Sequence, residues 1–75
     1  MVTAKILLDS VQKVKEFSSA VARMEAECEL VQGPRILDAK SIMGIFSLNL
    51  EEPVLLRINT DGSELPKSLR KFLAE

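Results

Sequence analysis

The chain has 75 residues and a net charge of −1, because ten basic side chains stand against eleven acidic ones. This length predicts one small domain over residues 1–75, which buries only about 60% of the surface that its unfolded chain exposes. The missing basic excess argues against direct binding to nucleic acid, which relies on Lys and Arg to meet phosphates. It argues equally against an electrostatic membrane anchor.

Several residue types that carry chemistry are absent or rare. The chain has no His, no Trp, no Tyr and one Cys, Cys28. Imidazole is therefore unavailable as a base, a phosphate acceptor or a metal ligand, and a Cys-rich metal cluster or an internal disulfide cannot form. The apolar runs are too short for a signal-peptide core or a membrane span. We predict a cytoplasmic domain that is not an enzyme and uses no metal or cofactor.

The N-terminal third predicts a strand followed by a helix. Residues Thr3–Leu8 are β-branched and apolar, which is typical of a strand. Asp9 and Ser10 then offer a helix cap, with Gln12 three residues after Asp9 in the spacing of a capping box. Apolar residues recur every three or four positions after this cap, which predicts an amphipathic helix of about four turns. Its predicted apolar stripe consists of Val11, Val14, Phe17, Val21 and Met24.

The middle of the chain predicts a hairpin and a short helix. Residues 27–32 alternate in the manner of a half-buried strand, with Cys28 as a small buried residue whose thiol pKa Glu27 and Glu29 would raise. Gly33-Pro34 signals a turn, and Arg35–Ala39 resumes an extended pattern. Ser41 then caps a short helix that Asn49 ends.

The last third predicts a strand and a final helix. Val54–Asn59 forms the strand, and Ser63 caps a helix whose outer side is basic and faces solvent. The apolar face of this helix is expected at Leu65, Leu69, Phe72 and Leu73, and its basic side at Lys67, Arg70 and Lys71. The order β-α-β-β-α-β-α favours an α+β open-faced sandwich with a four-stranded antiparallel sheet.

Residues 38–48 read Asp-Ala-Lys-Ser-Ile-Met-Gly-Ile-Phe-Ser-Leu. This segment resembles the regulatory-serine segment of HPr, the small phosphocarrier of the bacterial sugar phosphotransferase system. In that family a strand runs into Lys-Ser-Ile-Met-Gly at the start of a short helix. The order of elements is also similar to the HPr fold over most of the chain. The resemblance therefore implies an HPr-like open-faced β-sandwich.

The resemblance does not carry over the phosphocarrier activity. The family's carrier histidine, and the arginine and proline that follow it, fall on Ser10, Gln12 and Lys13 of this chain. The first strand also runs so close to Val11 that the family's active-site loop is expected to be shortened. Because a serine hydroxyl needs an activating base to act at neutral pH, we expect no histidine-type relay. A phosphotransferase that uses Ser10 or Asp9 is the remaining enzymatic alternative.

Ser41 matches a serine that a dedicated ATP-dependent kinase phosphorylates in HPr of low-GC Gram-positive bacteria. A phosphate there would add about −1.5 to −2 charge units at a helix start, where backbone N–H groups favour an anion. The alternative is that Ser41 is only a helix cap, worth on the order of 1 kcal/mol. Ile42, Met43 and Phe46 match apolar residues that meet partner proteins in the family. Alternatively, Ile42 and Phe46 fold into the core, although Ile45 and Leu48 can take that role.

One branch of the family, the catabolite-repression HPr of bacilli, lacks the carrier histidine and keeps the serine, as this chain does. The resemblance to it implies a regulatory binding domain in which phosphorylated Ser41, with Met43 and Phe46, docks on a LacI-type transcriptional regulator. The alternative is a diverged HPr-fold module unrelated to sugar transport, acting as a scaffold or as an oligomer such as a homodimer that pairs through its sheet edges. The short segment after the fourth strand would favour such association, because it leaves the sheet less covered.

Overall fold

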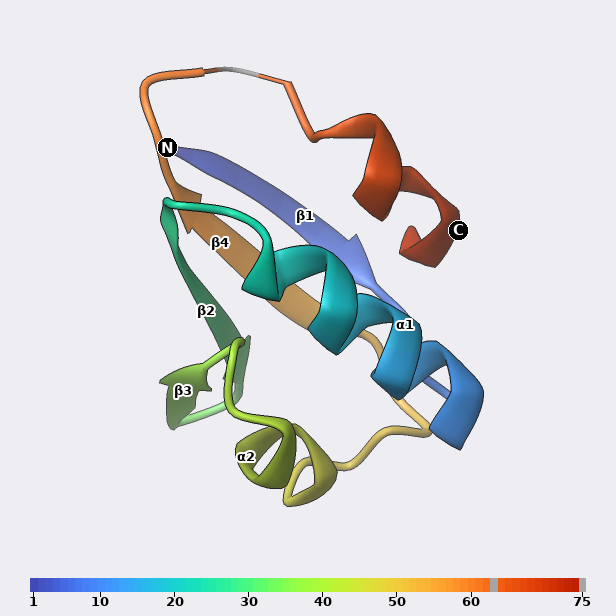
Figure 1. Ribbon diagram of the computed structural model, residues 1–75. Coiled ribbons are helices and arrows are strands. Elements are labelled where there is room, and N and C mark those ends of the chain that lie inside the picture. Colours follow the sequence, from blue (N-terminus) through green and yellow to red (C-terminus); the bar gives the residue numbers. More distant parts are fainter. Residues whose placement is uncertain (63, 75) are drawn as a thin grey trace.

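The computed structural model describes residues 1–62 and 64–74, which contain four strands and three helical segments (Figure 1). In chain order these are β1 (Val2–Ile6), α1 (Val11–Ala22), β2 (Glu27–Gln32), β3 (Arg35–Asp38), α2 (Ile42–Phe46), β4 (Val54–Asn59) and the 3-10 helix η1 (Lys67–Phe72). The predicted α+β class and the predicted order of elements are confirmed. The Ser63 cap that the sequence suggested lies outside the described residues.

The four strands form one antiparallel sheet in the order β1-β4-β2-β3. The central strand β4 pairs with β1 on one side and with β2 on the other, so that Ile58 lies opposite both Val2 and Cys28. All three of these side chains are buried. Because side chains alternate between the two faces of a strand, this register gives the sheet one apolar face. The helices of the described chain pack on that face (Figure 1).

Helix α1 begins at Ser10, whose hydroxyl oxygen accepts a hydrogen bond from the Lys13 N–H at 3.1 Å. The predicted capping box is wrong, because the Gln12 amide donates instead to the Glu16 carboxylate at 2.9 Å. Val14, Phe17 and Val21 are buried as predicted. Val11 is 58% exposed, because at 100° per residue it stands about 120° around the helix from Phe17. Its place in the predicted stripe is therefore wrong.

The first strand ends at Ile6 rather than Leu8, although Leu8 is still buried. The ladder with β4 ends at the pair Ile6–Val54, where β4 begins directly after Pro53. On the other edge of the strand, the Leu7 N–H donates to the Phe72 carbonyl at 2.8 Å. Strand β3 ends at Asp38 rather than Ala39, although the Ala39 N–H still donates in register to the Cys28 carbonyl at 2.9 Å.

Helix α2 starts after Ser41 as predicted but is capped at its end by Ser47 rather than Asn49. Asn49 is held elsewhere, because the Gln32 side chain bonds both of its backbone groups. The Asn49 N–H donates to Gln32 Oε1 at 2.9 Å, and Gln32 Nε2 donates to the Asn49 carbonyl at 2.8 Å. This double hydrogen bond ties the segment after α2 to the end of β2.

The C-terminal helix is a 3-10 helix, not the predicted α-helix. Its hydrogen bonds run from the Leu69 N–H to the Pro66 carbonyl and from the Leu73 N–H to the Arg70 carbonyl. With three residues per turn, Leu69 and Phe72 fall on the same side, and both are buried. Leu73 is instead 46% exposed, so its place on the predicted apolar face is wrong.

One apolar core lies between the sheet and the helices. Phe17 of α1 and Phe72 of η1 meet in it edge to face, with ring centroids 5.6 Å apart. All the fully buried side chains among the described residues are apolar. No helix in residues 1–62 and 64–74 is both long enough and apolar enough to cross a membrane.

Candidate functional site

The first candidate position is Ser10 at the start of α1, the position onto which the resemblance to HPr puts the carrier histidine. The Ser10 hydroxyl accepts from the Lys13 N–H and forms no hydrogen bond to a basic side chain within the described part of the chain. The Asp9 side chain is about half exposed, and its Oδ1 lies 3.0 Å from Lys13 Nζ. The hydrogen bond from Lys13 lowers the pKa of Asp9 below its ordinary value. Ser10 is thus a cap beside an ion pair, which supplies no activated nucleophile.

The second candidate position is Ser41, at the start of α2. Its side chain is exposed, and its hydroxyl oxygen accepts one hydrogen bond from the Gly44 N–H at 3.3 Å. Its own N–H donates to the Asp38 carbonyl at 3.0 Å, which fixes the turn from β3 into the helix. The predicted capping role is confirmed.

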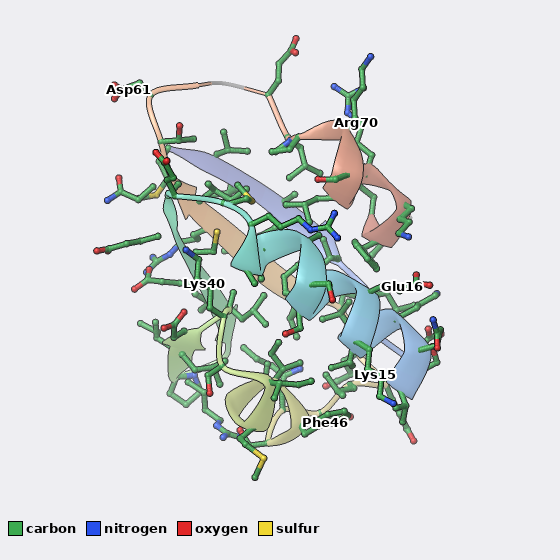
Figure 2. All side chains as sticks on the ribbon, viewed as in Figure 1. Lys15, Glu16, Lys40, Phe46, Asp61 and Arg70 are labelled. Atoms are coloured by element: carbon green, nitrogen blue, oxygen red, sulfur yellow. The ribbon has the colours of Figure 1, made fainter. Side chains whose placement is uncertain are left out.

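Helix α2 presents three exposed apolar side chains after Ser41. They belong to Ile42, Met43 and Phe46, and we call them the α2 patch. Met43 is 79% exposed and Phe46 44% exposed, whereas Ile45 and Leu48 are buried. The prediction that Ile45 and Leu48 serve the core is confirmed, and the alternative that Ile42 and Phe46 fold into the core is wrong. Figure 2 shows Phe46 on the side of α2 that lies toward α1, the helix that α2 contacts.

Long-range hydrogen bonds hold α2 in place. The Arg35 guanidinium donates to the Ser47 carbonyl and, at 2.7 Å, to the Ser47 hydroxyl. That hydroxyl in turn donates to the Gly44 carbonyl at 2.6 Å. On the other side, Lys40 Nζ donates to the Met24 carbonyl at 2.7 Å, which links the turn before α2 to the end of α1. The roles of Arg35 and Lys40 could not be predicted from the sequence, because their partners lie 12 to 16 residues away and no local motif joins them.

Cys28 is the third feature with possible chemistry. It is buried, and burial raises the pKa of its thiol; Lys40 acts in the lowering direction and Asp38 in the raising direction. The prediction that Glu27 and Glu29 raise this pKa is wrong, since Glu29 points to the neighbouring strand and pairs with Arg57. Because the thiolate is the reactive form, Cys28 is a packing residue. No cluster of His, Cys, Asp and Glu in the described residues is arranged to hold a metal ion.

The three basic residues near the C-terminus have different surroundings. Lys71 Nζ lies 3.1 Å from the Glu16 carboxylate of α1 and 5.4 Å from the centre of the Phe72 ring. The Arg70 side chain turns back and donates to the Leu65 carbonyl at 3.2 Å. Lys67 is exposed. The predicted solvent face is therefore partly engaged with α1.

No family model matches this sequence, and no curated protein matches it significantly. A search of solved structures finds the crystal structure of HPr-C-His from Thermoanaerobacter tengcongensis, with a TM-score of 0.69 and 22% sequence identity. The match covers 91% of this chain and 80% of that one. At this level of identity the likeness concerns the fold alone. The chain therefore has the open-faced β-sandwich fold of HPr.

Proposed function

We propose that this chain is a non-catalytic regulatory domain that docks a protein partner through the α2 patch and is switched by phosphorylation of Ser41. One observation carries the proposal: an exposed serine caps a short, well-anchored helix that also presents three exposed apolar side chains. Aromatic and Met side chains are enriched at protein interfaces. The absence of His from the chain leaves a hydroxyl as the natural place for a phosphoryl switch.

The switch would act on the docking surface and leave the core in place. Ser41 belongs to the surface, and its phosphate would add about −1.5 to −2 charge units beside the α2 patch. The hydrogen bond from Gly44 N–H to the Ser41 oxygen is long, at 3.3 Å, so little structure opposes the change. A partner that presents Arg or Lys next to an apolar pocket would gain charge-assisted hydrogen bonds. By resemblance, we propose a LacI-type transcriptional regulator in a bacterial cytoplasm as that partner.

The switch is tested by intact-mass spectrometry after incubation with ATP and a bacterial HPr kinase. We expect one phosphate on the wild type and none on Ser41→Ala. Ser10→Ala is the matched control, because Ser10 caps α1 through the same kind of bond to the N–H three residues on. It should take up one phosphate like the wild type. A folded wild type without phosphate, or a phosphate lost in Ser10→Ala, would contradict the proposal.

A scaffold or oligomer unrelated to sugar transport is the second candidate, and one observation favours it. Ile36 is exposed on β3, which is an edge strand of the sheet. Unpaired edge strands are templates for association with another chain. The other edge is less available, because Leu73 bridges to Ile6 of β1 and the Ala74 N–H donates to the Lys5 carbonyl at 2.9 Å. Light scattering on a size-exclusion column distinguishes a dimer from a monomer.

A further inference from the structure

A shallow groove of about 510 Å³ lies between α1 and η1, and no residue of the α2 patch lines it. We call it the basic groove. Its cations and hydroxyls come from Lys15, Ser19 and Arg23 on α1 and from Lys67, Ser68 and Lys71 on η1. Glu16, labelled in Figure 2, lies between these two sets and pairs with Lys71. The groove thus has one wall from each helix.

Each wall holds a serine between two cations. On α1, Lys15, Ser19 and Arg23 are spaced by four residues and therefore line up along one side of the helix. The rise of an α-helix places Lys15 and Arg23 about 12 Å apart along the axis. On η1, Ser68 likewise stands between Lys67 and Lys71 in the chain, and all three are exposed. The groove therefore offers positive charge near both of its ends and hydroxyl donors in between.

The groove is the positive region of an otherwise acidic protein. Among the described residues that line it, four cations stand against one acid, Glu16, which gives a local charge of +3. Since the whole chain has a net charge of −1, the remaining residues together carry −4. Lys15, Arg23 and Lys67 form no ion pair with any residue in the described part of the chain. Their charge is available to a ligand.

Packing in the core beneath the basic groove fixes the distance between its two walls. Under the groove, the Phe17 and Phe72 rings pack against each other in the core. At its end, η1 is anchored to β1 by the bridge between Ile6 and Leu73 and by the bond from the Leu7 N–H to the Phe72 carbonyl. The lysine and arginine stems therefore project from a rigid base, which lowers the entropy cost of gathering cations around an anion.

We infer that the basic groove binds a small molecule that carries at least two phosphate groups. Because the backbone positions of Lys15 and Arg23 are about 12 Å apart along the helix axis, a ligand with phosphates at two points meets both ends with less bending of the side chains than a single phosphate requires. The volume lies within the range of small-molecule sites, roughly 300–1,000 Å³, and the polar lining suits a charged ligand rather than an apolar one. A long nucleic acid is disfavoured, because the rest of the surface carries a net negative charge and the chain has no Trp or Tyr to stack on bases.

The inference is tested by titrating the ¹⁵N-labelled protein with inorganic tripolyphosphate and following the amide resonances. We expect shifts concentrated in residues 12–23 and 67–72, with binding at least tenfold weaker for inorganic monophosphate. The double variant Lys15→Gln with Lys67→Gln should bind tripolyphosphate about tenfold more weakly. Binding should also weaken as ionic strength rises from about 0.01 M to about 0.1 M, since the Debye length falls from about 30 Å to about 10 Å.

A second double variant, Lys5→Gln with Lys13→Gln, removes the same total charge outside the groove and should bind like the wild type. Both of its positions lie elsewhere: Lys5 is on β1, and Lys13 pairs with Asp9. If the two double variants weaken binding equally, the effect is one of net charge and the site does not exist. Tighter binding of a short single-stranded RNA than of tripolyphosphate would likewise overturn the assignment to a small molecule. None of these results depends on Ser41 or on the α2 patch.

Discussion

Replacing Phe72 by alanine should destabilise the protein by about 3–5 kcal/mol, the usual cost of removing a buried Phe side chain. Phe72 is buried and packs edge to face on Phe17, so its ring joins η1 to α1. A chain of this length has a total free energy of unfolding of roughly 4–11 kcal/mol, at roughly 0.05–0.15 kcal/mol per residue. We therefore expect the variant to be largely unfolded near 50 °C or in mild urea. Urea unfolding followed by circular dichroism measures the loss.

Leu73→Ala is the matched control for this prediction, because Leu73 adjoins Phe72 in the same segment but is 46% exposed. Its bridge to Ile6 is made by backbone atoms and survives the substitution. We expect it to cost less than about 1 kcal/mol, as is usual for partly exposed positions. Equal losses in the two variants would mean that the C-terminal segment does not pack as described.

The second prediction is that substitutions at two neighbouring residues of α2 have different effects on stability. Ile45 is fully buried, so Ile45→Ala should lower the free energy of unfolding by about 2–5 kcal/mol. Phe46 is 44% exposed and belongs to the α2 patch, so Phe46→Ala should leave stability within about 1 kcal/mol of the wild type. If the α2 patch docks a partner, Phe46→Ala should instead weaken binding by tenfold or more, since aromatic interface residues often contribute above 1.4 kcal/mol.

Denaturant unfolding and a binding titration with the phosphorylated protein measure the two effects separately. Met43→Ala serves as a second surface variant, because Met43 is still more exposed and lies on the same helix. Full binding by both Met43→Ala and Phe46→Ala would show that the α2 patch is not the docking surface, even if Ser41 is phosphorylated. A stability loss in Phe46→Ala as large as that in Ile45→Ala would place Phe46 in the core.

Hydrophobic periodicity predicted most of the strands and helices, and local backbone geometry explains the elements that were predicted wrongly. The strand at residues 27–32 and the strand Val54–Asn59 have the predicted bounds, because short apolar, β-branched segments flanked by turn residues mark them. The last helix was assigned the wrong type, since leucines at positions 65, 69 and 73 fit a 3.6-residue period. In the structure the buried pair is Leu69 and Phe72, and their spacing of three suits the tighter helix.

Only part of the candidate site could be predicted from the sequence. Ser41 and the α2 patch could be found because they form one contiguous segment. The residues that hold this segment could not, since Arg35 reaches Ser47 and Gln32 reaches Asn49 only once the chain has folded. The basic groove could not be predicted from the sequence either. Lys15 and Lys67 are about 50 residues apart in the sequence and share a surface only because η1 packs on α1.

The position of β4 at the centre of the sheet has a consequence for how the chain folds. Strand β1 finds its partner about 50 residues away, at Val54–Asn59, whereas β2 and β3 are joined by a two-residue turn. Pairings between distant segments slow folding, because the chain must close a long loop before it gains the contacts. During synthesis, β1 leaves the ribosome first and waits without a partner until β4 emerges. The β2–β3 hairpin and α1 are therefore the elements able to form early, and the sheet is completed last, at its middle.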